Sequence, residues 1–453
     1  MSHLNWEIPS SINLEGFLEK YPPEFKYNID HFYHIIEYLT KGMDQEDLDN
    51  NEGFINMSSR VLQKSIRNYK QYLNHLLDYG LIKSDKKYIV GEKCFGYLIQ
   101  GYPTHKATVK EVPVQSFVMK KNRAKDFNEK KIKLKLTEKK YPNLTKWFNS
   151  KLVIDVEKAT NKVEELFPEQ TGSIRGKRKG KPSIWNQRFK AIYSIHKFAK
   201  QEFYYSVDDN VGRFHSNLTN IKKEVRNYIT YDSQKLVNID IKNCQPLLST
   251  LLFNINFYKN NSQIINIYNI PTCNLLLSNT FTSYSSSIIM LVKTIQKTDN
   301  EKIKEYVDMI NTGEFYKKIS DKLYPNMPFD KQKIKEMIFT VFFSNNRFIG
   351  QTEAKSKRAF KDNFLEIYKL FKQIKVANHR ALAHILQRIE SELIIQKVSK
   401  RIFLEKPDLP IFTIHDSVAT TVGNEDYVSS ILMEEAKKLT GLNIKLGLEY
   451  WDY

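Results

Sequence analysis

Cysteine is scarce in this chain of 453 residues, which contains only three. Cys94, Cys244 and Cys273 lie far apart, and no two of them form a CxxC pair. Disulfide frameworks and structural zinc sites need cysteines at close or regular spacing. The pattern therefore argues against both and favours a reducing compartment.

Membrane spans and secretory leaders have no counterpart in the sequence either. No segment approaches the roughly 20 apolar residues that cross a bilayer. The first residues, MSHLNWEIPSSINLEGF, lack a basic segment followed by an apolar one. We therefore expect no contact with a membrane and a cytoplasmic protein, in the host cell's cytoplasm if a phage encodes it.

Acidic residues are outnumbered, since 51 Asp and Glu face 70 Lys and Arg and leave a formal charge of +19. A charge of this sign attracts phosphate backbones, so nucleic acid is the leading expected partner. A genome rich in Lys codons, or a protein of the membrane surface, would give the same balance. The length predicts two or three domains.

Residues 1–105 have the pattern of a winged helix. Between Asn28 and Ile99 the sequence predicts three helices and then two strands around Gly91. Ser58 and Ser59 are candidate N-caps of a helical pattern with few acids. Its basic residues are Arg60, Lys64, Arg67 and Lys70. Such a module can enter a major groove, or it can pack against the next domain.

Residues 106–203 are rich in lysine and predict basic helices. The loop GSIRGKRKGKPS at 172–183 contains Gly and Pro, which prevent helix, and its cations suit a phosphate backbone. Solvated helices explain the other charges equally well. Asp155 and Glu157 in LVIDVEK have the spacing with which proofreading exonucleases begin. We interpret them as part of a charged helix, because the periodicity is helical and the segment is too short for a nuclease.

Residues 204–453 mix strand-like runs with long helices, which predicts an α+β unit. In LVNIDIKNCQPLLSTLL an apolar strand over 236–239 delivers Asp240, and a helix begins near Pro246. A carboxylate at the end of a buried strand is costly unless it is paired or bound to a metal. Asp240 therefore needs a partner.

PIFTIHDSVATT supplies that partner. It predicts a strand over 411–414, His415 and Asp416 at its tip, and a returning arm. Two carboxylates on adjacent strands can hold two divalent cations for nucleotidyl transfer. Either aspartate alone can equally be a turn or capping residue.

The segment KQKIKEMIFTVFFSNNRFIG repeats side chains every four residues. Lys331, Lys335, Phe339 and Phe343 therefore present two cations and then two rings on one helical face. A helix with an apolar core face and a basic edge has the same spacing.

NIDIKNCQP, this helix and TIHDS resemble motifs A, B and C of family A DNA polymerases and of the related phage-type single-subunit RNA polymerases. The resemblance covers residues 204–453 and implies palm and fingers, with residues 106–203 as thumb and linker. It implies two Mg²⁺ ions, or Mn²⁺, at Asp240, Ile241 and Asp416, and a monomer acting on template, primer and nucleoside triphosphates. By the same resemblance Lys331 and Lys335 bind the triphosphate, Lys335 also acts in catalysis, and Phe339 and Phe343 stack on base and sugar.

Three further segments resemble the family in the expected order. VGRFHSNLTNI implies that Arg213 contacts the primer end, and HRALAHILQRIESELII places Gln387 in the minor groove. His415 joins them as a primer or template contact, and LGLEYWDY places Trp451 beside the palm. A surface ion pair for Arg213 and hydrogen bonds within a helix pair for Gln387 are the alternatives.

Departures from the family bear on the choice of sugar. Gln245 replaces the Glu that blocks the ribose 2′-hydroxyl in DNA polymerases, Phe343 replaces a Tyr, Lys331 replaces an Arg, and Ser417 follows HD as in the RNA enzymes. Because Gln is as bulky as Glu and Phe offers no hydroxyl to a ribose, we expect ribonucleotides to be excluded and the enzyme to be a DNA polymerase. A winged helix ahead of a polymerase without exonuclease suggests a small enzyme serving DNA replication in a phage, plasmid or mobile element. An RNA polymerase or primase is the alternative, and a non-catalytic DNA-binding replication protein is the second.

Overall fold

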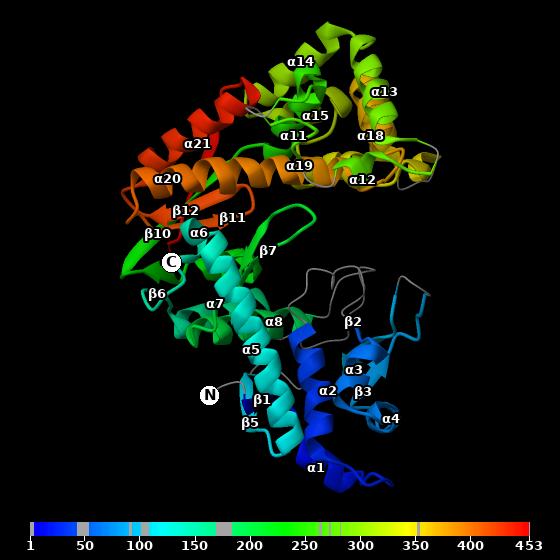
Figure 1. The fold of residues 1–453 in the computed structure, drawn as a ribbon, viewed down its shortest axis with the longest axis vertical. Coiled ribbons are helices and arrows are strands. Elements are labelled where there is room, and N and C mark those ends of the chain that lie inside the picture. The colour runs from blue at the N-terminus through cyan, green and yellow to red at the C-terminus, as the bar shows by residue number, and fades with distance from the viewer. Residues whose placement is uncertain are drawn as a thin grey trace.

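The computed structural model describes residues 4–42, 54–89, 93–100, 108–168, 184–261, 265–270, 273–280, 282–350 and 354–452. The basic loop at 172–183 and the turn at Gly91 lie outside these ranges. Two large hydrophobic cores organise the described chain, one in an N-terminal unit and one around a central sheet (Figure 1). None of the described helices is long and apolar enough to cross a membrane.

Between Asn28 and Ile99 the N-terminal unit has three helices ahead of two paired strands, as predicted, but it also contains a short strand after the first of these helices and further elements outside this span. Its elements are β1 (Asn5–Pro9), α1 (Leu14–Lys20), α2 (Ile29–Gly42), β2 (Ile55–Asn56), α3 (Ser59–Ser65), α4 (Tyr69–Asp78), β3 (Ile82–Ser84), β4 (Gly96–Ile99) and β5 (Val109–Pro113). The strands β2, β4 and β3 form one antiparallel sheet in that order. The helical pattern after Ser58 is divided in two, because Ile66 is extended at φ −133° and ψ 102°. Since β5 pairs with β1, this unit extends beyond residue 105, where the sequence places its boundary.

The middle segment is only partly helical. It contains α5 (Phe117–Lys140), α6 (Pro142–Thr145), β6 (Leu152–Ile154), α7 (Val156–Leu166) and α8 (Ile184–Ala199). α5 runs from the N-terminal unit to the central sheet (Figure 1), and residues 125–133 are exposed on every side. The prediction of a helix through LVIDVEK is wrong in its first half. Leu152–Ile154 form β6 because β9 (Ile229–Tyr231) offers a pairing partner, and Asp155 caps α7 by accepting from the Lys158 N–H.

The central sheet is antiparallel and has the order β11 (Ile411–Ile414), β12 (Ser417–Thr421), β10 (Gln234–Ile241), β9, β6. A further strand, β13 (Leu446–Tyr450), pairs with β10 on the side opposite β12. A continuous helical rod crosses it, formed by α19 (Ala381–Ser391), the π-helix η7 (Glu392–Ser399) and α20 (Lys400–Glu405). α21 (Glu425–Thr440) packs against both the rod and the sheet (Figure 1). The two strand predictions around Asp240 and Asp416 are confirmed.

The second large group of elements is helical and lies along α19 (Figure 1). It comprises α11 (Cys244–Ser249), η3 (Thr250–Phe253), η4 (Ile255–Tyr258), α12 (Cys273–Leu277), α13 (Tyr284–Gln296), α14 (Asn300–Asn311), α15 (Phe315–Leu323), α16 (Lys331–Phe343), η5 (Asn346–Gly350), α17 (Lys355–Asn363) and α18 (Leu365–Ile374). Along the chain, four short elements separate α8 from β9. They are β7 (Tyr205–Val207), β8 (Phe214–Ser216), α9 (Asn217–Asn220) and α10 (Lys223–Arg226). The chain is therefore the mixture of helix and sheet that the sequence predicts.

Candidate active site

Two aspartates meet at one end of the central sheet. Asp240, near the end of β10, pairs with Ser417 on one side and with Gly447 on the other. Asp416 directly precedes Ser417 in the two-residue turn that joins β11 to β12. His415, the other residue of this turn, has a left-handed backbone at φ +56°. The register therefore brings the two predicted carboxylates to the same end of the sheet.

The charges around these aspartates suit a cation. Burial raises the pKa of Asp416, and the negative charge of Asp240 raises it further. Burial also raises the pKa of Asp240, followed by the charge of Glu449. Neither aspartate forms an ion pair with a side chain in the described ranges. Two half-buried carboxylates that form no ion pair with the described side chains are a donor set that fits Mg²⁺ or Mn²⁺. Ile241, the third expected ligand, ends β10, and since its side chain has no donor atom, only its backbone oxygen can serve.

Gly447 leaves room for one of the carboxylates. A Cβ added there would clash with Oδ1 of Asp240 and would lie 3.1 Å from its Cγ. The sequence prediction used this segment only to place Trp451, which is indeed buried and donates its backbone N–H to the Leu236 carbonyl at 2.9 Å. A glycine inside a strand is a signal of close approach, and it would have identified this position.

The predicted cationic and aromatic face of α16 is present. The residues that α16 buries are Ile334, Met337, Ile338, Val341 and Phe342. On the other side, Nζ of Lys335 lies 5.5 Å from the ring centroid of Phe339, and the rings of Phe339 and Phe343 are 5.3 Å apart. Burial raises the pKa of both aspartates, and the charges of Lys331 and Lys335 partly offset the rise at Asp240 and at Asp416 respectively. This face therefore lies within electrostatic range of both aspartates.

Arg213 and Gln245 have a partner that the sequence analysis missed. Arg213 donates from Nε and Nη2 to Oε1 of Glu390 at 3.0 and 2.7 Å, and the Gln245 amide donates to Oε2 of the same carboxylate. Burial and the charge of Asp416 raise the pKa of Glu390 to about 7, whereas Arg213 and Gln245 oppose the shift. Arg213 is thus ion-paired, as in the alternative reading, although with a buried rather than a surface acid.

The remaining predicted contacts lie close to this network. Gln387 is half-buried on α19, one turn before Glu390 and Ser391. Burial lowers the pKa of His415 to about 4, and the nearby charge of Arg213 acts in the same direction, so the ring is neutral at pH 7. Its Nδ1 is buried and has no hydrogen-bond partner among the described residues.

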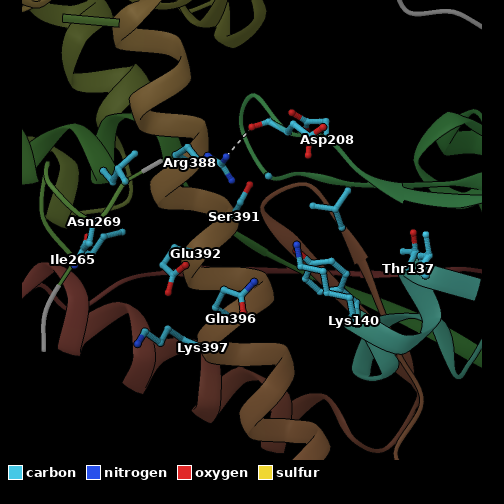
Figure 2. Close-up of a pocket in the computed structure, with 16 residues that line it drawn as sticks. Thr137, Lys140, Asp208, Ile265, Asn269, Arg388, Ser391, Glu392, Gln396 and Lys397 are labelled. Atoms are coloured by element: carbon cyan, nitrogen blue, oxygen red, sulfur yellow. Dashed lines mark hydrogen bonds between the residues drawn. The ribbon is translucent and has the colours of Figure 1, made fainter. Parts of the chain in front are cut away.

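A cavity of about 630 Å³ opens beside the rod (Figure 2). It lies between the end of α5, the turn after β7, η7 and residues 265–270. Its polar lining residues include Thr137, Lys140, Asp208, Arg388, Glu392 and Gln396. Arg388 donates to the backbone oxygen of Asp209 at 2.7 Å, which fixes one wall. Arg388 follows Gln387 directly in the sequence.

A separate cluster of two glutamates and a histidine in the described ranges has ligand atoms close enough to hold one ion. Glu7, Glu111 and His196 place ligand atoms within 4.8 Å of one another. Lys197 forms an ion pair with Glu7, and Lys200 forms one with Glu111. The lysines already neutralise these carboxylates, so the cluster is better explained as an ionic contact joining β1 and β5 to α8. The three cysteines are free.

Comparison with known proteins adds little to this geometry. No family model matches the chain, and no curated protein matches it. Among solved structures, the polymerase domain of Pol1 from M. smegmatis, in complex with DNA primer-template and dNTP, is similar. Identity is 10%, the match covers 69% of this chain and 69% of that chain, and the TM-score is 0.40. A likeness of this size carries no argument, so functional inference depends on the site itself.

Proposed function

We propose that this protein is a template-directed nucleotidyltransferase, a single-subunit polymerase that adds nucleotides to a primer. One observation carries the proposal. The strand register brings Asp240 and Asp416 to the same end of the central sheet, within electrostatic range of the cationic face of α16. The reaction is in-line attack of the primer 3′-hydroxyl on the α-phosphate, which releases pyrophosphate.

The side chains divide this work. Asp240 and Asp416, with the backbone oxygen of Ile241, would hold two Mg²⁺ ions, which when bound activate the attacking hydroxyl and stabilise the leaving group. Lys331 and Lys335 place positive charge where the triphosphate gathers negative charge. Phe339 and Phe343 form a continuous aromatic surface on which a base and sugar can stack.

Primer and template occupy the surface around Arg213, Gln387 and His415, beside the cavity along η7. The N-terminal unit acts as a winged helix that binds duplex. Arg60, Lys64, Arg67 and Lys70 are all exposed, which supports this part of the proposal. We favour a small DNA polymerase without exonuclease in a phage, plasmid or mobile element. RNA synthesis, by an RNA polymerase or primase, is the alternative.

Extension of a labelled primer on a DNA template, with dNTPs and rNTPs supplied separately, tests the proposal. Asp240→Ala and Asp416→Ala should each abolish incorporation while leaving template affinity and fold nearly intact, because metal ligands act mainly on the transition state. Asp408→Ala is the matched control, since this aspartate follows α20 with its side chain 97% exposed. Substantial synthesis by either site variant would refute the two-metal assignment. Template binding without incorporation by the unmodified protein would favour a non-catalytic replication protein.

A further inference from the structure

One buried carboxylate connects two parts of the site that the sequence treats separately. Glu390 is 2% exposed on α19. Its Oε1 accepts both hydrogen bonds from Arg213, which precedes β8, and its Oε2 accepts from the amide of Gln245 in α11. Each oxygen therefore fixes a residue from a different segment of the chain.

The chemistry of the carboxylate dictates how Gln245 is turned. Both oxygens of Glu390 accept hydrogen bonds, and the amide nitrogen of Gln245 therefore faces Oε2. Its Oε1 points elsewhere and is buried without a hydrogen-bond partner among the described residues. A side chain with only one of its two polar atoms satisfied is held by that single contact. Removing the charge on Glu390 would weaken this contact and hold Gln245 less firmly.

The same carboxylate also holds Arg213. The Arg213 side chain is 22% exposed and faces a fully buried acid, so this charge-assisted contact is weakly screened by water. Burial raises the pKa of both Asp416 and Glu390, and the charge of Arg213 partly offsets each rise. Glu390 therefore keeps a cation beside one of the two proposed metal ligands.

We propose that Glu390 is a positioning residue that makes the choice of sugar and the grip on the primer end depend on one carboxylate. It orients Gln245, the residue that replaces the usual barrier to the 2′-hydroxyl, and it holds Arg213, the expected primer contact. The inference rests on the proposed function, because both effects are defined by nucleotide incorporation.

The experiment measures kcat/KM for one dNTP and its rNTP on the same primed template. The unmodified protein should prefer the dNTP by roughly ten- to a hundredfold. Gln245→Ala should reduce that preference, and Glu390→Gln should also reduce it, by a smaller factor, because a neutral amide holds Gln245 less firmly than the carboxylate does. The double variant should show no further loss. Glu390→Gln should also raise the KM for primer-template, but not in an Arg213→Ala background.

Glu37→Gln is the matched control for losing a buried charge. Glu37 is 4% exposed and binds Arg123 through both oxygens, at 2.5 and 3.2 Å, in the N-terminal unit. This variant should lose stability and keep its sugar preference. If Glu390→Gln does not fold, Arg213→Lys tests the same link, because lysine keeps the charge and loses the forked contact. Its sugar preference should fall although Arg213 is not a sugar contact.

Several results would overturn the inference. One is an unchanged preference in Glu390→Gln, or in Arg213→Lys where that variant replaces it. Another is a change of equal size in the Gln245→Ala background, and a third is an equal change in Glu37→Gln. Absence of incorporation by the unmodified protein refutes the proposed function instead, so the two failures can be told apart.

Discussion

Two regions of the molecule bring like charges together, and they differ in what faces those charges. At the end of the central sheet, Asp240 lies close enough to Asp416 for its charge to act on that carboxyl. No described side chain forms an ion pair with either aspartate. At the C-terminal end of α16, Lys357 and Lys375 are 1% and 3% exposed. Their amines also lack an acidic partner among the described residues.

The lysines are satisfied by the chain itself. Nζ of Lys375 donates to the backbone oxygens of Val341 and Ser344 at 2.7 and 3.1 Å. Nζ of Lys357 donates to the Asn345 oxygen at 2.8 Å and to the Ser344 hydroxyl at 3.1 Å. Cations at the C-terminal end of a helix meet its free carbonyls and its dipole. A pair of buried like charges therefore indicates a ligand site only where the protein's own groups do not stabilise the charges.

After loss of the aspartates themselves, the largest effect should come from removing Lys335, one of the cations within electrostatic range of the acidic pair. Lys335→Ala should lower kcat/KM for the nucleoside triphosphate by about 10²- to 10³-fold, because it removes a charge that faces developing negative charge. Lys333→Ala is the matched control, since this lysine lies on the same helix with its side chain 81% exposed and pairs with Asp330 at 3.2 Å. Equal kinetics for the two variants would mean that α16 does not face the triphosphate.

The acidic pair should also be sensitive to the space beside it. Gly447→Ala would push the Asp240 carboxylate out of place, and a displacement of about 1 Å can cost about 10²-fold in rate. We expect incorporation to fall by that order while template affinity is kept. Gly350→Ala, at a position with no atom within 4 Å of the added Cβ, provides the comparison. A Gly447→Ala enzyme with full activity would show that Asp240 tolerates movement.

The lysine pair should appear in the pH dependence of stability. Burial, and then the charge of Lys357, lower the pKa of Lys375 from 10.5 to about 7. Between pH 7 and 10.5 the unfolded chain binds more protons at this residue than the folded chain. Its contribution to the free energy of unfolding therefore rises with pH across that window and is constant below it.

Urea unfolding at pH 7 and pH 9 measures this slope. Lys375→Met should lose the rise, whereas Lys372→Met, an exposed lysine on the same helix, should keep it. Equal slopes in Lys375→Met and the unmodified protein would mean that the amine is charged in both states. The lysine pair would then be a pair of buried charges like the acidic pair, and the contrast between the two regions would fail.

The smallest effect on incorporation is expected from the N-terminal unit, whose cations are exposed and widely spaced. Replacing Arg60, Lys64, Arg67 and Lys70 by Ala should weaken duplex binding and flatten its dependence on salt. Incorporation on a short primed template should be nearly unchanged. Unaltered duplex affinity would favour a packing role. Point variants suit this test better than deletion of residues 1–105, because deletion would leave β5 without β1.

Local patterns were enough to predict the parts of the site that depend on neighbouring residues. The apolar runs before Asp240 and Asp416 predicted two strands, and both form as expected. The four-residue spacing from Lys331 to Phe343 predicted one helical face, and along it Lys335 contacts the ring of Phe339, which contacts that of Phe343. In each case side-chain direction follows from the period of a single element.

Only tertiary structure decided which distant residues share a contact. Glu390 lies 177 positions from Arg213 and 145 from Gln245, so no local pattern marks it as their partner. Leu152–Ile154 form a strand because β9 offers free backbone groups, which overrides a helical periodicity. The sequence by itself determined which side chains each strand and helix presents. Which charges are buried, and which residues bond to them, depends on folding, because folding brings separate segments together.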